Sequence, residues 1–591
     1  MAPNPPTNPS PARPIGCLLI LLVVALICGS LFWPNPVTLD DIEIPAAKSL
    51  TCEPLGISSS AGPALTLAPS GLWYQDAVIL TGLPADVQRV AAQALGVEQP
   101  FAATGLIGLA RLNPTQQQPD IAPALQRYSQ LALALYSTGQ ENGQPRPPVA
   151  AVQAVLQASL DLFLAGEISE PVFADLNYVT GFPSVIGSPW SVTGSPWGVE
   201  ASPWSVTGSP WSVTGSPWSV TGSPFESDAD KLARYQTTAE RAYWTQWPLQ
   251  ADAGLGVYTS GPYQRQTPAD GAGARVVIFD TSPYATEGLQ TETRAQMQVN
   301  LCSHLVPLPA NDAPADATGY MRDHGLFAAG LTYAVAPESE LHLVRVLDDN
   351  AVGDLFTLVK GISEFTVAAA TTNGGRLNGY VYNFSLGLKR DPATLPAELL
   401  DLNQKLVDEM IARGQTPPEL LDGLPLLSLE APLNSARALG AVLVAAAGND
   451  SADLNPALTE NAPASFDNVL GVQSTNLDRD RSCYANTGEA GAPGADGGAA
   501  TDASGSACAP RLDLCKADAP CPYGLVSLVS EQADTVGFAY WVGSSFASPL
   551  VAGAAADALS AGIAPDVVQA NALLDSASAT GVVNVVDAAT P

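Results

Sequence analysis

Apolar and polar residues begin to follow a regular pattern after about residue 70. The segment 72–80 is apolar enough for a strand, and 84–95 spaces its apolar residues as one face of a helix does. These elements open a small α/β module, predicted at 70–181 after a linker at 34–69. Two further helices and a closing strand complete it, at 121–136, 149–164 and 172–178.

A second pattern, of short apolar segments separated by helical ones, starts at about residue 226 and runs to residue 591. Strands interleaved with helices predict a mostly parallel sheet covered by helices, which is a three-layer α/β fold. Ligand sites on such sheets gather at the carboxyl ends of the strands. The expected strands are 274–279, 341–346, 380–384, 441–446 and 469–472.

Between these two regions, at 182–225, lies a linker built from a repeated heptapeptide, Gly-Ser-Pro-Trp-Ser-Val-Thr. A proline in every unit excludes a coiled coil, although the period is seven. An extended or turn-rich spacer is one interpretation, and aromatic side chains that stack on glycan or along a groove are another. The regularly spaced aromatic residues are Trp190, Trp197, Trp204, Trp211, Trp218 and Phe225.

The N-terminus carries an uncharged, mostly apolar run at 15–33, about as long as a bilayer-spanning helix needs to be. Arg13 precedes the run and acidic residues follow it, so we expect residues 1–14 in the cytoplasm and the rest outside the cell membrane, with one span. The alternative is a signal peptide cleaved after small residues at 28–30, which would give a secreted protein.

The net charge limits the kinds of partner that this protein can bind, and the cysteine content indicates its compartment. A formal net charge of −32 with only 25 basic residues excludes nucleic acid as a partner. Six cysteines outside the membrane run allow fifteen pairings, as expected for an exported protein with disulfides. Zinc is the weaker interpretation of the cluster Cys508, Cys515 and Cys521, because the spacing is not of the Cys-x-x-Cys type.

Four polar residues lie where catalysis by acyl transfer needs them. Asp280 follows a strand, His324 stands at a turn into a helix, Asn449 follows another strand, and Ser545 begins an alanine-rich helix. Individually, each could be a helix cap or a turn residue. The chain has only three histidines, and the other two occupy an apolar strand (His342) and a loop beside a cysteine (His304). Both are expected to be structural, with a Cys302/His304 metal contact as the alternative for His304.

The order and surroundings of these four residues resemble the subtilisin-like serine peptidases, the subtilases, over roughly Tyr243 to Ala558. Residues 280–282 read Asp-Thr-Ser where the family has Asp-Ser/Thr-Gly. The histidine motif keeps His-Gly and Ala-Gly but has Leu326 for threonine. The serine motif at 543–549 has Ser544 for threonine and Phe546 for methionine. Further similar segments are 336–341, 345–347, 383–387, 463–475 and 492–494.

The resemblance implies roles for each residue. Ser545 would be the nucleophile, His324 its base, Asp280 the residue that orients the histidine, and Asn449 a donor to the oxyanion. The substrate would be a protein or peptide, and no cofactor is required, although structural calcium is common in the family. An acidic loop at 348–350 is too weak a signal to assign as its site. The substrate-binding residues implied are Ser385, Leu386, Gly387, Ala446, Ala447 and Gly448.

The same resemblance suggests that the module at 70–181 is a prodomain, which assists folding, inhibits the enzyme and is removed by autocleavage within or after the repeat. The segment 390–433 is expected to form surface helices beside the substrate cleft, either to control access or as decoration. One alternative function is an idle surface protein that binds through the tryptophan repeat. Another is an acid peptidase, against which His324 and Asn449 both argue.

Overall fold

The structure is a computed structural model, and several predicted features lie outside the residues that it describes. These features are the apolar run 15–33, the helices 84–95 and 121–136, the repeat, and Cys508, Cys515 and Cys521. Within the described ranges, no helix combines the length and the apolar character that crossing a bilayer requires. The described residues are 50–52, 65–82, 97–98, 107–111, 147–181, 240–250, 255–259, 264–266, 269–294, 297–309, 320–388, 390–451, 457–494, 524–530 and 537–569.

The main sheet has eight strands, seven of which run parallel to their neighbours, as the alternating pattern predicted. Strand β6 closes one edge and pairs antiparallel with β7. All five strands expected from the sequence are present, because each is an apolar run buried between two helical layers. In spatial order the strands are β16 (Ala490–Pro493), β15 (Leu470–Thr475), β14 (Val442–Ala446), β10 (Tyr380–Phe384), β5 (Arg275–Asp280), β8 (Glu340–Arg345), β7 (Met297–Leu305) and β6 (Gly288–Arg294).

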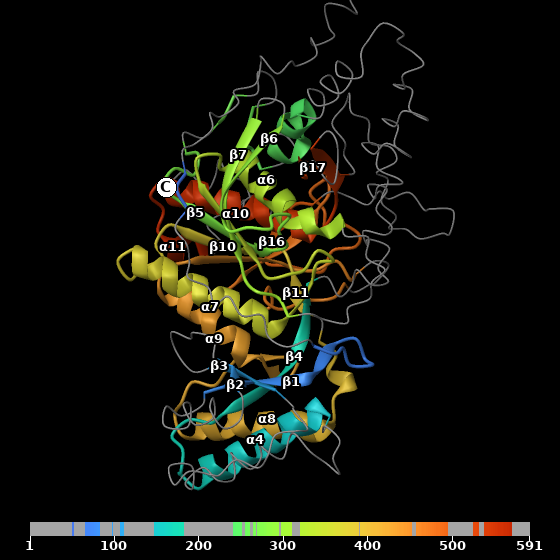
Figure 1. The fold of residues 1–591 in the computed structure, drawn as a ribbon, viewed down its shortest axis with the longest axis vertical. Helices are drawn as coiled ribbons and strands as arrows, with labels where there is room; N and C mark the ends of the chain where they lie inside the picture. Colours follow the sequence, from blue (N-terminus) through green and yellow to red (C-terminus); the bar gives the residue numbers. More distant parts are fainter. Residues whose placement is uncertain are drawn as a thin grey trace, which may run out of the picture. The chain divides into compact units, whose positions relative to one another are not determined.

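Helices cover this sheet on both faces (Figure 1). Helices α6 (His324–Val335) and α10 (Ser544–Ser560) pack against each other on one face, and α7 (Leu355–Thr372) and α9 (Leu427–Ala438) pack together on the other. The three-layer fold is therefore confirmed. Smaller elements at its periphery are η5 (Trp247–Leu249), η6 (Tyr320–Asp323), η7 (Pro392–Thr394), α11 (Pro565–Val567) and the antiparallel hairpin β17 (Leu525–Leu528) and β18 (Phe538–Trp541).

A second sheet contains the predicted N-terminal module, of which the structure describes parts of residues 70–181. Its strands are β1 (Trp73–Thr81), β2 (Val97–Glu98), β3 (Ile107–Arg111) and β4 (Phe173–Gly181), with helix α4 (Pro148–Leu164) packed on β1 and β4. Two short strands from the second half of the chain join this sheet. They are β9 (Val352–Asp354) and β11 (Gly387–Leu388), and both pair with β4. Figure 1 shows β4 reaching from the small sheet to β11.

The segment 390–433 forms helices, as expected, and its longest one packs against the module. Helix α8 (Ala397–Ala412) lies along α4 (Figure 1), and the hairpin of β12 (Leu420–Leu421) and β13 (Leu424–Pro425) follows it. At the end of α8, the Arg413 guanidinium carbon lies 4.1 Å from the centroid of the Phe163 ring. Gln415 donates a hydrogen bond of 2.7 Å to the carbonyl of Ser169. The inserted segment is therefore part of the surface that contacts the module.

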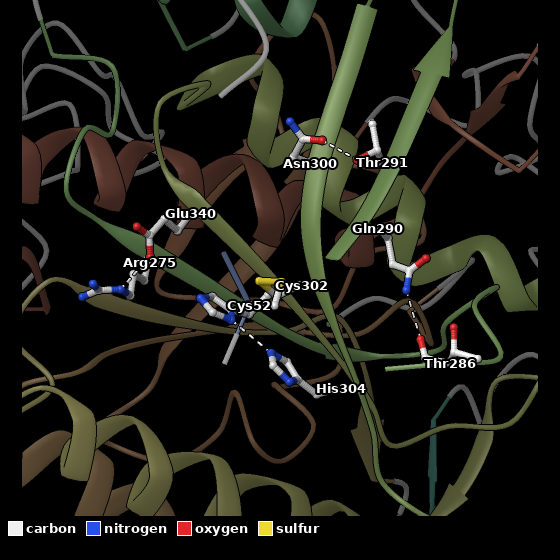
Figure 2. Close-up of a disulfide and its surroundings, with 10 residues drawn as sticks. Cys52, Arg275, Thr286, Gln290, Thr291, Asn300, Cys302, His304 and Glu340 are labelled. Carbon is white, nitrogen blue, oxygen red and sulfur yellow. Dashed lines mark hydrogen bonds and ion pairs between the residues drawn. A yellow bond between two sulfur atoms is a disulfide. The ribbon is translucent and has the colours of Figure 1, made fainter. Parts of the chain in front are cut away.

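A disulfide joins Cys52 to Cys302 on β7, with the two Cα atoms 5.5 Å apart (Figure 2). Cys483 is disulfide-bonded as well. The expectation of disulfides is thus confirmed, and the alternative of a Cys302/His304 metal contact is wrong because the Cys302 sulfur is already bonded to Cys52.

Candidate active site

Asp280 and His324 meet where β5 ends and α6 begins. The Nδ1 atom of His324 lies 2.9 and 3.0 Å from the two carboxylate oxygens of Asp280. The exposed fractions are 0% for Asp280 and 2% for His324, so water competes little for this contact. The backbone N–H of Thr281 donates a hydrogen bond of 2.7 Å to Asp280 Oδ1, which fixes the carboxylate. A neutral histidine held this way carries its proton on Nδ1 and presents Nε2 as the basic atom.

Gly325 allows the two elements to approach this closely. A Cβ atom at this position would lie 2.3 Å from the carbonyl oxygen of Thr281 and 3.0 Å from Cβ of Asp280. Any larger residue would therefore push α6 away from β5. The Thr281 hydroxyl accepts a hydrogen bond of 3.1 Å from the Gly325 N–H, which satisfies a backbone donor in the first turn of the helix.

Ser545 stands in the first turn of α10, and the ends of neighbouring strands hold that turn in place. Gly543 precedes the helix with φ of 145°, and a Cβ atom there would lie 3.2 Å from Nδ2 of Asn449. The Ser385 hydroxyl, just beyond β10, donates a hydrogen bond of 2.7 Å to the Ser545 carbonyl. Ser545 is 5% exposed. Its backbone N–H belongs to the free donors at a helix start, where negative charge is stabilised.

Asn449 follows β14 and contacts the same helix start. Its Oδ1 atom accepts a hydrogen bond of 2.9 Å from the Ser544 N–H. The adjacent Gly448 N–H donates a hydrogen bond of 3.1 Å to the Ser544 hydroxyl. This contact orients the amide, whose NH2 group can donate to another molecule. Serine in place of threonine at 544 therefore keeps a hydroxyl that links β14 to α10.

Aromatic rings surround His324, a feature that the sequence did not predict. The ring of Phe546, the residue after Ser545, has its centroid 4.9 Å from that of His324. Trp541 on β18 stacks on His324 at 5.7 Å with an interplanar angle of 28°. Phe327 packs against both aromatic residues. These contacts place Ser545 and His324 at the same end of the sheet and limit the movement of the imidazole.

The two other histidines form a separate pair and cannot serve this site. His304 lies in strand β7 (Figure 2), and not in a loop as expected. Its Nε2 atom is 3.1 Å from Nδ1 of His342 on β8. Burial lowers the pKa of His304 to about 3 and the pKa of His342 to about 4. Both rings are therefore neutral near neutral pH. Their structural role agrees with the prediction, and His324 is the histidine that contacts Asp280.

Strand β4 lies between two strands from the second half of the chain, β9 and β11. Gly181 and Thr180 pair antiparallel with Gly387 and Leu388 of β11. The same end of β4 pairs antiparallel with β9, and Asn177 donates a hydrogen bond of 3.1 Å to Asp354. Sequence reasoning missed β9, because three residues show no periodicity. Among the other expected substrate-binding residues, Leu386, Ala446 and Ala447 are buried at the ends of β10 and β14.

Metal binding finds little support near this site. Asp348 Oδ1 accepts hydrogen bonds of 2.9 Å from the N–H groups of Asn350 and Val352, so it organises the turn that leads into β9. Among the described residues, no group of three or more His, Cys, Asp or Glu side chains is placed to hold a metal ion. Calcium therefore stays a prediction.

Comparison with known proteins identifies the family to which this chain is similar. The model of the Subtilase family, peptidase S8, matches residues 289–586, about half of the 591-residue chain. The match contains His324, Asn449 and Ser545 and begins after Asp280.

Two curated relatives are similar to parts of the chain. "Subtilisin-like protease 8" of Arthroderma otae is 25% identical over 189 residues, which are 31% of each protein. A subtilisin-like serine protease of Cochliobolus lunatus is 25% identical over 224 residues, 37% of this chain and 35% of the relative. The chain thus spans about a third of the length of these relatives.

Two solved structures are similar at 20% identity. A cold-adapted subtilisin-like serine proteinase has a TM-score of 0.33 and aligns over 57% of this chain and 96% of its own. A protease from Pseudoalteromonas arctica has a TM-score of 0.36 and aligns over 59% and 96%. At these TM-scores the assignment depends on the family model and not on the structural neighbours. The chain belongs to the subtilase family.

Proposed function

We propose that this protein is a serine endopeptidase that hydrolyses peptide bonds through an acyl-enzyme formed on Ser545. The observation that carries the proposal is the contact of 2.9 Å between His324 Nδ1 and the buried carboxylate of Asp280. A histidine oriented in this way, at the same end of the sheet as a serine in a helix start, has the components of acyl transfer.

In the proposed reaction Ser545 Oγ attacks the substrate carbonyl while His324 Nε2 takes its proton. Asp280 keeps the imidazole in the correct tautomer and stabilises the imidazolium that forms. His324 then gives the proton to the leaving amine, and water hydrolyses the acyl-enzyme by the reverse sequence. The Ser545 N–H and the Asn449 amide are the proposed donors to the oxyanion, at about 3 kcal/mol each.

The substrate chain would pair with β9 and β11 in the place where β4 pairs with them in this structure. In this arrangement the backbone groups of Gly387 bind the substrate main chain, and Ser385 and Leu386 support that strand. Ala446, Ala447 and Gly448 line the opposite side, where β14 ends. Their small side chains leave space for a substrate side chain.

A fluorophosphonate tests the proposed activity, because it reacts only with an activated serine. We expect one equivalent to label the folded chain, freed of its module, with the label on Ser545 by peptide mass spectrometry. The heat-denatured protein is the control and should not react. The same experiment should show labelling slowed roughly 10²- to 10³-fold by Asn449→Ala. A folded chain without label, or with its label elsewhere, would refute the proposal.

We further infer that the N-terminal module is a prodomain that blocks the site until the chain cuts itself. The support is the position of β4, which pairs with both β9 and β11, the two strands that the substrate would use. Gly181 lies opposite Gly387, and Gly387 is two residues after Ser385. The Ser385 hydroxyl donates a hydrogen bond to the Ser545 carbonyl. The peptide bonds that follow Gly181 are therefore the ones best placed for attack.

N-terminal sequencing of the processed protein tests this inference. We expect the new N-terminus within residues 182–188, before the first tryptophan of the repeat, so that the whole repeat stays on the peptidase. A purified Ser545→Ala chain should remain uncut under the same conditions. A cut after residue 225, or a cut in the Ser545→Ala chain, would contradict self-processing at the end of β4.

A further inference from the structure

The Cys52–Cys302 disulfide crosses the boundary at which the main chain is expected to be cut. Cys52 precedes the N-terminal module, whereas Cys302 lies in β7 of the main sheet, 250 residues later. The module and the linker 182–225 both fall between the two cysteines. Any single cut after Gly181 therefore opens the main chain but leaves both pieces joined through sulfur.

The two sulfur atoms differ in their access to solvent. Cys302 is fully buried on β7, the strand next to the edge strand β6, with His342 opposite it in the β7–β8 register. Cys52 is partly exposed. A thiol from solvent can therefore approach the bond only from the Cys52 side.

The disulfide holds the module beside a surface that it already fits. Only seventeen residues separate Cys52 from Ser70, where the module begins. A tether this short keeps a cut module at an effective concentration on the order of millimolar. The module can then return to α8, β9 and β11 after each dissociation, as the α4–α8 packing and the Arg413–Phe163 contact favour.

We propose that the Cys52–Cys302 disulfide makes the processed protein a two-chain molecule, in which the cut module stays covalently attached and keeps returning to the substrate site. The apolar run 15–33 precedes Cys52 and so remains attached as well. Self-cleavage alone then releases neither the module nor the peptidase. This regulation rests on the proposed function, since it concerns how that site is blocked.

Release requires a dithiol reductant or a second cut between Cys52 and the module. One thiolate of the reductant attacks Cys52 Sγ, and Cys302 leaves as a thiolate that takes up a proton. The second thiol of the reductant then displaces Cys52 as a thiol and closes a disulfide in the reductant. Two electrons and two protons pass to the protein, and the N-terminal part leaves with Cys52.

The connection itself can be tested without any activity of the protein. A Ser545→Ala chain with a site-specific protease sequence in the repeat is cut by that added protease and examined on denaturing gels. We expect one band without reductant and two bands with it. A matched chain that also carries Cys52→Ser and Cys302→Ala should give two bands in both lanes. Two bands from the chain with both cysteines in the absence of reductant would overturn the proposal.

The functional consequence is tested with Ser545 present, in the same pair of chains cut at the inserted sequence. Latency should be independent of protein concentration in the disulfide-linked chain. Over a 1,000-fold dilution, the Cys52→Ser, Cys302→Ala chain should gain at least roughly tenfold in specific activity, because its module can leave. If the specific activity of both chains changed equally on dilution, the proposal that the disulfide tethers the module would be overturned. Absence of activity in the diluted Cys52→Ser, Cys302→Ala chain would count against the proposed function and leave the gel result intact.

Discussion

Ser545→Ala is expected to lower kcat for a peptide substrate roughly 10⁶-fold, the largest effect of any single substitution in this chain. The alanine removes the atom that forms the acyl-enzyme, and the His324–Asp280 pair then has no nucleophile to activate. The residual rate would come from water bound beside the oxyanion donors. KM should change little, because the strands that bind the substrate backbone are unaffected.

This comparison needs chains that are processed equally, since Ser545→Ala cannot cut itself. Both proteins therefore carry the inserted protease sequence and the Cys52→Ser and Cys302→Ala substitutions, and the module is removed after cutting. Ser560→Ala is the matched control. It makes the same chemical change at the far end of α10, where the hydroxyl donates a hydrogen bond to the Asp557 carbonyl. A Ser545→Ala protein with more than about 1% of the parent kcat would reveal another nucleophile.

The candidate site could be selected from the sequence because each of its residues is attached to a strong local signal. Asp280 and Asn449 end apolar strand runs, and Ser545 begins an alanine-rich helix. The carboxyl ends of parallel strands meet at one edge of a sheet, so these positions converge whatever the loops do. The scarcity of histidine then left His324 as the base.

The sequence could not predict which short strands pair with each other or which distant cysteines form a disulfide. The strands β9 and β11 are three and two residues long, too short to show a period, and both are defined by their contact with β4. Cys52 could have paired with any of five cysteines. The position of His304 in a strand was missed because this end of β7 is defined by its parallel pairing with β8, in which His304 lies opposite Val344.

Contacts with His324 were equally hidden from sequence reasoning. Trp541 is on a hairpin more than 200 residues from the histidine that it stacks on, and nothing in the hairpin's own pattern indicates that contact. Phe546 was recognised only as a departure from the family motif. Its ring contact with His324 shows that the departure changes the surroundings of the base.

Asp280→Asn is expected to lower kcat roughly 10⁴-fold while leaving KM within about threefold. The side chains have the same shape, so the fully buried site should keep its packing. An asparagine that donates its amide N–H to His324 Nδ1 would place the histidine's proton on Nε2, the atom that must accept a proton from Ser545. It would also remove the negative charge that stabilises the imidazolium, so both steps of proton transfer would suffer.

Steady-state kinetics on the processed proteins, with thermal unfolding as a check of the fold, measure this effect. Asp401→Asn is the matched control, because Asp401 is exposed on α8 and pairs only with Lys405 among the contacts described for it. That variant should keep the parent kcat. A fall of less than tenfold for Asp280→Asn in a folded protein would mean that His324 does not depend on this carboxylate, and the contact of 2.9 Å would then serve structure and not proton transfer.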